Sequence, residues 1–503
     1  MAVPFHVWCR IFVLGLVATG CGAAAVRPAP IPATTAAHCS AVAAAYAAKV
    51  TTGQHVEVQV QWSETAGDET IREAELARRL AQGVAGSQVW VLGRGGSGKS
   101  HLADLVEASL CRESLALRVD CERDLAPRMV GAPDRGSALA QVLAEQLGLA
   151  PQTDPTEALR SALSGPWTLI LDGTDELSAH EQVLLLRDLR WLSLGPWVQP
   201  SLIRFERPGF DGNEGGPRPR AIVSLATLRC DQADGVLARR FADAAALAAA
   251  RAWLAAHHLD RQRSGGTGCS YVHMPTWRDA ELVADLAADA ARGARPLPAH
   301  VSQADLWQAW IGNRWAPGAA NADASLAWID RMTAASARGA ATPDLVLTQQ
   351  TCTASAPEGL ATAAEACAAL FASPVTAPAR ATGTWMPRHR TLVDVALARW
   401  LVAKHGDCRS LANAVAGHAS LELMAMVVAQ PAGRRCLDRV LGAACEQGMA
   451  AKTLQPFVDE VLPREPAVAA QVRLSRERAT SACVRQVLEG LDSVAAPSSN
   501  PAP

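Results

Sequence analysis

One eight-residue segment, Gly93-Arg-Gly-Gly-Ser-Gly-Lys-Ser100, constrains this chain more than any other feature. It fits the pattern GxxxxGK[ST], whose glycines let the backbone turn tightly and point successive N–H groups at an anion. The apolar run 89–92 before it predicts a buried strand, and residues 101–108 after it predict the start of a helix. Strand, glycine-rich loop and helix follow one another as in a phosphate-binding loop, so a chance match in a glycine-rich turn is the weaker interpretation.

The pattern assigns a role to each residue of the segment. Lys99 is expected to reach the β- and γ-phosphates of a nucleoside triphosphate, and the Ser100 hydroxyl to ligate Mg²⁺. The start of the following helix adds its partial positive charge to the site. The remaining residues expected to surround the phosphates are Gly93, Arg94, Gly95, Gly96, Ser97, Gly98 and His101.

A second motif follows the apolar run 167–172, which reads Asp172-Gly-Thr-Asp-Glu176 at its end. A carboxylate at the end of a buried strand beside a phosphate loop is placed to hold Mg²⁺ and its waters, and we assign this role to Asp172. Asp175 and Glu176 are candidates for polarising the attacking water. The alternative is an ordinary Asp-Gly turn after a strand.

Strand and helix patterns alternate through the first half of the chain. This alternation predicts an α/β domain with a parallel sheet covered by helices on both faces. Residues 69–82 are expected to be helical, whereas 195–219, rich in Pro and Gly, are expected to form an insertion loop. Beyond about residue 235 only helical patterns remain. The strands are expected at 55–62, 89–92, 115–120, 167–172 and 220–225.

The acidic motif resembles the corresponding motif of the NACHT NTPases, which belong to the STAND class of P-loop ATPases. The segments 222–229, 272–277 and 385–400 resemble the family's sensor strand, the start of its helical subdomain and its winged helix. The resemblance implies that Arg229 contacts a γ-phosphate, that Pro275 packs near the adenine and that His389 touches the β-phosphate of bound ADP.

From their own residues alone, these three positions have simpler interpretations. Arg229 fits a surface ion pair, Pro275 the first position of a helix, and His389 a local helix cap.

The resemblance also implies a switch that is closed with ADP and open with ATP, and that forms homo-oligomers in the ATP state. Its signalling partner cannot be identified from the sequence. Two rival classes are an ATPase of the AAA type and a non-catalytic binding module that retains the fold. The implied divisions are a signal peptide (1–21), a tether with a helix and a strand (22–66), the NTPase domain (67–235), a helical subdomain (236–337), a winged-helix-like subdomain (338–405), a C-terminal helical region (406–491) and a disordered tail (492–503).

The N-terminus points to a membrane. Arg10 is followed by an apolar stretch and then by Ala18-Thr-Gly-Cys21, which resembles a bacterial lipoprotein signal. That resemblance implies cleavage and lipidation at Cys21, which would anchor the protein to a membrane. The alternatives are a signal anchor or a mis-assigned start, either of which leaves the NTPase domain facing the cytoplasm.

The net charge and the cysteine content bear on two further questions, whether the protein binds nucleic acid and whether it contains disulfides. A net charge of −2 gives no reason to expect a nucleic acid. Of the 13 cysteines, loss of Cys9 and lipidation of Cys21 leave an odd number, so at least one is unpaired. If the protein is exported, Cys352 with Cys367, or Cys436 with Cys445, are candidate disulfides; otherwise the cysteines are small buried apolar residues.

Overall fold

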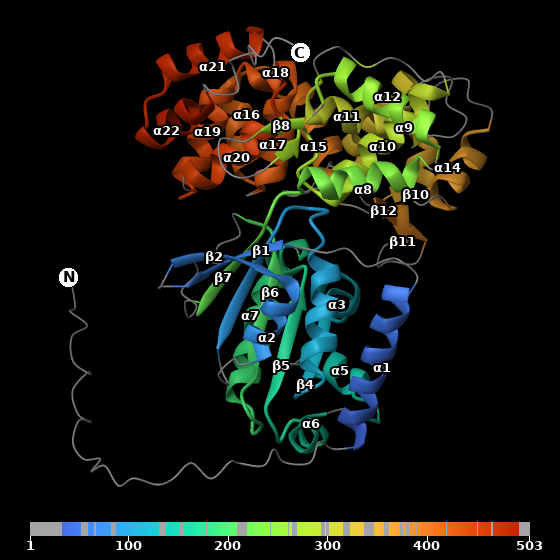
Figure 1. The fold of residues 1–503 in the computed structure, drawn as a ribbon, viewed down its shortest axis with the longest axis vertical. Coiled ribbons are helices and arrows are strands. Elements are labelled where there is room, and N and C mark those ends of the chain that lie inside the picture. The colour runs from blue at the N-terminus through green and yellow to red at the C-terminus, as the bar shows by residue number, and fades with distance from the viewer. Residues whose placement is uncertain are drawn as a thin grey trace.

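The computed structural model divides the described part of the chain into two lobes, a lower one built on a sheet and an upper one built of helices (Figure 1). Cys21, His389 and the tail 492–503 lie outside the described residues. The described residues are 33–51, 59–64, 67–81, 87–129, 137–150, 155–177, 179–208, 219–241, 243–259, 261–263, 269–292, 297, 301–314, 322–336, 347–356, 362–372, 376–378, 383–387, 390–418, 420–449, 451–463 and 466–491.

The lower lobe contains a seven-stranded sheet in the order β2-β1-β7-β3-β6-β5-β4. Five neighbouring strands, β7 to β4 in that order, are parallel, and β1 with β2 forms an antiparallel pair at the β7 edge. The strand bounds are β1 Gln59–Glu64, β2 Gly67–Arg72, β3 Gln88–Leu92, β4 Leu115–Asp120, β5 Trp167–Asp172, β6 Ser201–Glu206 and β7 Ala221–Leu225.

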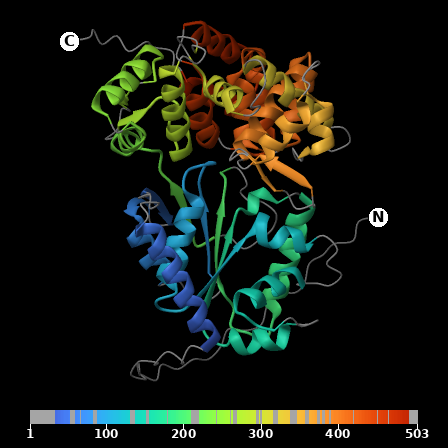
Figure 2. The same cartoon turned by 90° about the vertical axis from the view of Figure 1, so that its right-hand side faces the viewer.

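Helices cover both faces of this sheet, as Figure 2 shows. Successive residues of β5 point to opposite faces: Leu169 and Leu171 belong to one buried apolar cluster and Ile170 to another. Both faces are therefore dry, which confirms the predicted α/β sheet with helices on both sides. The helices of this lobe are α1 Ala33–Thr51, α2 Glu73–Ala81, α3 Lys99–Leu110, α4 Ala126–Met129, α5 Ser137–Gln146, α6 Thr156–Ala162 and α7 Ala179–Leu194.

Two sequence predictions for this lobe are wrong in part. Residues 69–72 are strand rather than helix, because Ile71 is buried and pairs with Val60 of β1, so the sheet overrides the local helical pattern. The segment 195–219 is not only a loop, because it contains β6, which pairs on both sides with β3 and β5. The prolines of that segment flank β6 instead of interrupting it.

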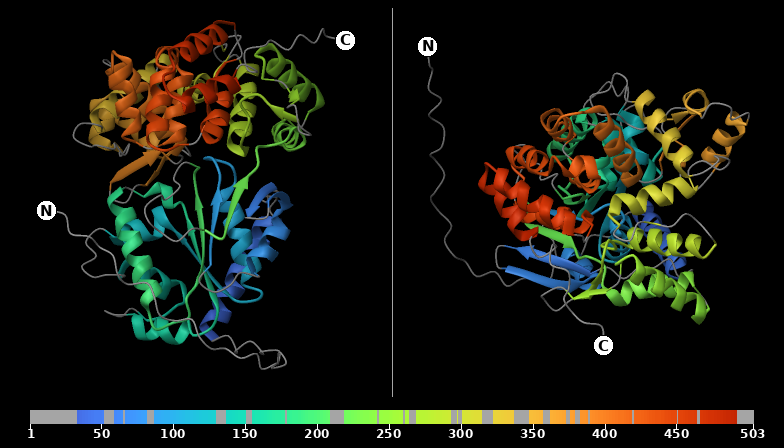
Figure 3. Two further views of the ribbon diagram at one scale, coloured as in Figure 1. Left: turned by 90° about the vertical axis from the view of Figure 1, so that its left-hand side faces the viewer. Right: turned by 90° about the horizontal axis from the view of Figure 1, so that it is seen from above.

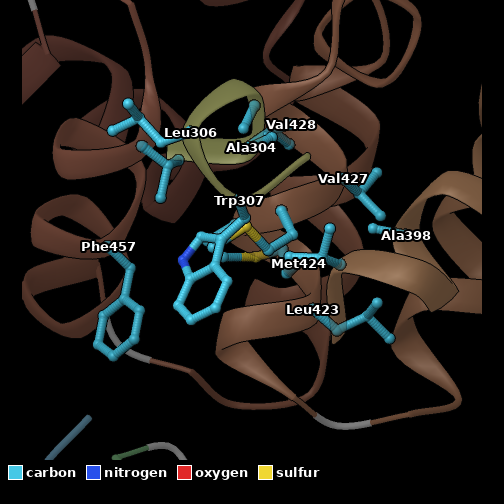
Figure 4. Close-up of a cluster of buried hydrophobic side chains, with 14 of the residues drawn as sticks. Ala304, Leu306, Trp307, Ala398, Leu423, Met424, Val427, Val428 and Phe457 are labelled. Atoms are coloured by element: carbon cyan, nitrogen blue, oxygen red, sulfur yellow. The ribbon is translucent and has the colours of Figure 1, made fainter. Parts of the chain in front are cut away.

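The upper lobe is helical and has one large apolar cluster of its own, which begins at Leu228 and ends at Leu491. Figure 4 shows Trp307 at its centre, with Met424, Val427 and Phe457 nearby. Among the described residues, no buried apolar cluster includes residues of both lobes. The helices are α8 Cys230–Arg240, α9 Ala244–Ala256, α10 Trp277–Ala291, α11 Gln303–Arg314, α12 Ala322–Ser336, α13 Gln349–Ala354, α14 Ala363–Ala372, α15 Arg390–Lys404, α16 Cys408–Ala416, α17 Leu421–Ala429, α18 Pro431–Arg434, α19 Leu437–Glu446, α20 Ala451–Val461, α21 Pro466–Arg478 and α22 Ala482–Gly490.

Two small sheets accompany these helices. One pairs β8 (Arg261–Arg263) with β9 (Cys269–Tyr271). The other, β10-β12-β11, is antiparallel and joins Leu347–Thr348, Thr384–Pro387 and Thr376–Pro378. The elements of this region follow one another in the order α12, β10, α13, α14, β11, β12.

Five disulfides join the described cysteines, and Cys121, which is buried, is the free thiol among them. The predicted bond between Cys352 and Cys367 is present. The predicted bond between Cys436 and Cys445 is not, because these residues lie at opposite ends of α19. Nine residues of helix separate them by roughly 13 Å, too far for a disulfide. The five pairs are Cys39–Cys111, Cys230–Cys269, Cys352–Cys367, Cys408–Cys436 and Cys445–Cys483.

The upper lobe lies across the end of the sheet where the parallel strands finish, as Figure 3 shows from the side and from above. In the described residues, no helix has both the length and the apolar character that crossing a membrane requires.

Candidate nucleotide site

The phosphate loop connects β3 to α3, as the sequence predicts. Gly96 and Gly98 have φ angles of +79° and +95°, a left-handed conformation that glycine adopts without strain. The Ser97 N–H donates to the Arg94 carbonyl at 3.2 Å and closes the turn. α3 begins at Lys99, and the N–H groups of a helix's first turn carry a partial positive charge that suits an anion bound in the loop.

A cavity of about 390 Å³ opens beside this loop. From the loop and the helix after it, Gly95, Gly96, Gly98, Lys99 and Ser100 line the cavity, together with His101. Its volume falls within the range of small-molecule sites. The structure thus brings six of the nine residues predicted to surround the phosphates to one partly open cavity, whereas Gly93, Arg94 and Ser97 are not in its lining.

The strand ends and the upper lobe complete the cavity. Asp172 and Glu176 contribute from the lower lobe, as does Asp120 at the end of β4. The upper-lobe residues in the lining are Trp277, Arg278 and Glu281 of α10 and Thr391 of α15. The cavity therefore lies at the junction of the two lobes, and any ligand in it would contact both.

Lys99 is folded back onto its own loop. Its ammonium group donates to the carbonyl of Gly93 at 2.7 Å and to that of Arg94 at 3.1 Å. The side chain is thus already held at the end of the loop where this lysine meets the β- and γ-phosphates.

The acidic motif follows β5 as predicted, with Asp172 buried at the strand end. Arg118 of β4 donates to Asp172 and also to Asp104 of α3, which in turn pairs with Lys49 of α1 at 2.6 Å. Asp172 is therefore held by a neighbouring guanidinium and is one member of a chain of charges across four elements.

Glu176 lies on the short helical turn Thr174–Glu176 and reaches the cavity. The protein around it removes much of its hydration, and Asp175 and Glu122 repel its negative charge. Together these effects raise the pKa of Glu176 to about 8, in spite of the opposing charges of Arg207 and Lys99. In this arrangement the carboxyl is mostly protonated at neutral pH.

The oxygen donors present fit Mg²⁺. The Ser100 hydroxyl and the Asp172 carboxylate line the same cavity, and oxygen is the ligand that this ion prefers. In the part of the chain that the structure describes, no three acidic, histidine or cysteine side chains cluster as a metal site.

Arg207 is a site residue that the sequence analysis missed. It follows β6, is buried, and pairs with Asp175 at 3.0 Å, with Glu422 at 2.9 Å and with Asp394 at 3.3 Å. Burial disfavours its charge, but the three carboxylates outweigh burial and raise its pKa. The signal was the alternation of Ile203 and Phe205 before it, hidden within a segment assigned as a loop.

The structure does not place the residues assigned by the family resemblance, where it describes them, in the cavity lining. Arg229 is exposed, pairs with Asp231 at 2.6 Å and does not line the cavity, so it forms the surface ion pair that was its simpler interpretation. Pro275 is buried and precedes Thr276, the N-cap of α10, so it is not the first residue of the helix. It is absent from the cavity lining, whereas Trp277, two residues later, is part of it. His389 lies outside the described residues.

Three further contacts join the upper lobe to the phosphate loop. The Gly95 N–H donates to Glu422 of α17 at 2.8 Å, and the Arg278 N–H donates to the Gly96 carbonyl at 3.4 Å. The guanidinium of Arg94 lies 4.1 Å from the centre of the Phe457 ring of α20. The loop is therefore covered by the upper lobe on its outer side.

No family model matches the chain, and no curated protein matches it in sequence.

Two solved structures are similar in part. One is a Signal Transduction ATPase with Numerous Domains (STAND) protein with a tetratricopeptide repeat sensor, PH0952 from Pyrococcus horikoshii. It shares 10% identity over 84% of this chain and 64% of its own, with a TM-score of 0.29. The other is Cdc6p from Pyrobaculum aerophilum, with 14% identity over 62% and 86% of the two chains and a TM-score of 0.28. Because both TM-scores are below 0.5, neither similarity supports an inference about what this chain binds or does.

Proposed function

We propose that this protein is a NACHT-like P-loop NTPase that binds and hydrolyses ATP with Mg²⁺ and acts as a nucleotide-controlled switch. The observation that carries the proposal is the single cavity shared by the phosphate loop, the acidic motif and the upper lobe. A ligand there touches both lobes at once, which is the condition for a ligand to favour one arrangement of the lobes over another.

In this proposal, different residues of the cavity bind the phosphates, hold the metal ion and activate the water. Lys99 exchanges its two carbonyl partners for phosphate oxygens, and the loop amides hold the phosphates. Ser100 and Asp172 would hold Mg²⁺, which when bound would neutralise negative charge on the β- and γ-phosphates. Glu176, once deprotonated, accepts a proton from the attacking water.

In this proposal, the arrangement in which the upper lobe covers the phosphate loop is the closed, resting state of the switch. The raised pKa of Glu176 leaves little of the base form at neutral pH, so hydrolysis is slow while the lobes stay together. Opening in the ATP state frees the upper lobe and the outer side of the phosphate loop for contact with other copies of the chain. We therefore propose a homo-oligomer in that state.

The disulfides support a location outside the cytoplasm for this protein. Five of them form between described cysteines, and disulfides persist in oxidising environments outside the cytoplasm. Together with the N-terminal signal, they support an exported lipoprotein anchored to the membrane through Cys21.

Export favours a second candidate function. Free ATP is scarce outside the cytoplasm, so the protein would then use the same cavity to bind a phosphorylated ligand without turning it over. The residues Lys99, Ser100, Asp172 and Glu176 are common to both functions, and only turnover separates them.

The test measures binding and hydrolysis separately. A nucleotide at 100 times its Kd stabilises a protein by ~2.7 kcal/mol, so Mg-ATP or Mg-ADP should raise the Tm of the wild type by a few degrees. Lys99→Ala should abolish the rise, and an equal rise in that variant would overturn the site.

Turnover is then compared between the wild type and Glu176→Gln, which should bind ATP but hydrolyse it at least about a hundredfold more slowly. Binding without turnover in the wild type would leave the second function.

A further inference from the structure

Glu422 places a carboxylate on the phosphate loop from the opposite lobe. One of its oxygens accepts from the Gly95 N–H at 2.8 Å, and the other accepts from Arg207 at 2.9 Å. A loop amide and a buried guanidinium are the donors with which proteins commonly hold a phosphate group. The carboxylate thus occupies donors that suit an anionic ligand.

The contacts of Lys99 indicate which phosphate of a bound nucleotide would lie near Gly95 and Glu422. The ammonium group lies against the carbonyls of Gly93 and Arg94, immediately before Gly95 in the chain. Since this lysine reaches the β- and γ-phosphates, the Gly95 end of the loop is the end that meets the terminal phosphate. The opposite end, at Ser100, belongs to the metal ion.

Glu422 carries a negative charge where it lies. The side chain is buried, which by itself opposes ionisation, but Arg207 and the Gly95 amide outweigh burial and lower its pKa. A γ-phosphate brought to the same donors would meet this charge at close range with little water between them. Like charges in such a setting repel strongly.

Within the described residues, no buried apolar cluster spans the two lobes where Glu422 lies. The apolar clusters of the two lobes are separate, so within the described residues the lobes meet at the loop through the polar and ring contacts of Glu422, Arg278 and Arg94. A ligand that takes over Gly95 and Arg207 removes one of these contacts outright.

We propose that Glu422 stands in for the terminal phosphate, so that the closed protein is a site for a nucleoside diphosphate and a triphosphate binds only when Glu422 withdraws. This inference rests on the nucleotide-binding function proposed above and names the residue that sets its specificity. Arg207 exchanges one anionic partner for another in the process, and the lobes lose the Gly95 contact.

The experiment titrates the full oxidised chain with Mg-ADP and with Mg-AMPPNP, a triphosphate that is not hydrolysed, and records heat. The wild type should bind the diphosphate more tightly. Glu422→Ala should gain at least about tenfold in affinity for the triphosphate, while its affinity for ADP changes by less than about threefold. Glu422→Gln keeps the size of the side chain and removes the charge, so it should show the same direction of change even if the alanine variant does not fold.

Two controls separate the possible failures. Glu489→Gln changes an exposed carboxylate on α22 and should leave both affinities as they are in the wild type. An unchanged ratio of triphosphate to diphosphate affinity in both Glu422 variants, with ADP still bound, would overturn the role of Glu422 alone. Absence of binding of either nucleotide to the wild type would overturn the nucleotide-binding function itself, and this inference with it.

Discussion

The two lobes are held together internally by different means. The lower lobe has a hydrogen-bonded sheet with dry faces and one disulfide, between α1 and Cys111 after α3, whereas the upper lobe has four disulfides and no large sheet. No disulfide between described cysteines connects one lobe to the other. Each lobe therefore has packing and disulfide contacts of its own, whereas the contacts described at the phosphate loop between the lobes are hydrogen bonds, ion pairs and a cation–π contact.

Reduction of the disulfides should have the largest effect on stability. It should make the two lobes unfold in separate transitions. Each native disulfide contributes about 2–5 kcal/mol, and the upper lobe has four against one in the lower lobe. We expect a reductant to unfold the upper lobe first and to produce two thermal transitions in calorimetry. Loss of both lobes in a single transition would show that they are not independent.

Arg207→Met should have the next largest effect, because it leaves Asp175, Asp394 and Glu422 without their shared cation. Removing one partner of a buried ion pair costs about 3–5 kcal/mol. We expect a lower Tm and a more extended particle in small-angle X-ray scattering. Arg435→Met, at an exposed position of the upper lobe, is the matched control and should change neither quantity.

The pH dependence of turnover tests Glu176. A general base works in its deprotonated form, so with a pKa of about 8 in the closed arrangement kcat/KM should rise with pH and level off above that value. Below it the rate should fall about tenfold per pH unit. The Glu176→Gln profile should be low and flat. A wild-type midpoint near the ordinary pKa of glutamate would mean that Glu176 is not the base or is not desolvated.

Phe457→Leu should have the smallest effect on the balance between the lobes. It keeps an apolar side chain in the upper-lobe cluster and removes the contact of the ring with Arg94. A cation–π contact of this kind is worth about 1 kcal/mol, or roughly a fivefold change in the ratio of open to closed protein. Phe371→Leu changes a phenylalanine of the same apolar cluster that stacks on Trp385 instead. Equal opening in the two variants, measured by crosslinking between the lobes, would exclude a role for the Arg94 contact.

The sequence was most informative where chemistry requires particular residues in order. The loop from Gly93 to Ser100 and the motif from Asp172 to Glu176 were located because phosphate binding needs those residue types at those spacings. The strand β6 was missed because Pro and Gly on both sides disguised a short buried strand. Arg207 was missed for the same reason, because it directly follows this strand. It is the cation that joins the acidic motif to the upper lobe.

Contacts between lobes could not be predicted from spacing at all. Glu422 lies more than 300 positions after the loop that it contacts. It is the lone charged residue of the apolar helix α17, which indicates a buried carboxylate, but its helix does not identify the loop as the partner. The same is true of the partners of Cys436 and Cys445, which the folding of the upper lobe decides. Arg229 shows the opposite case, in which a resemblance to a family motif led to a residue that is exposed and does not line the cavity.

The separation of the apolar clusters also has a calorimetric consequence. Heat capacity rises when apolar surface is exposed to water and falls slightly when polar surface is exposed. Because the junction between the lobes is mainly polar, their separation should change the heat capacity very little, while unfolding of either lobe should raise it by ~13 cal/mol/K per residue. The free-energy difference between closed and open protein should then change almost linearly with temperature, without the curvature that unfolding of either lobe shows. A linear van't Hoff plot for opening, beside a curved one for unfolding, would distinguish separation of the lobes from their melting.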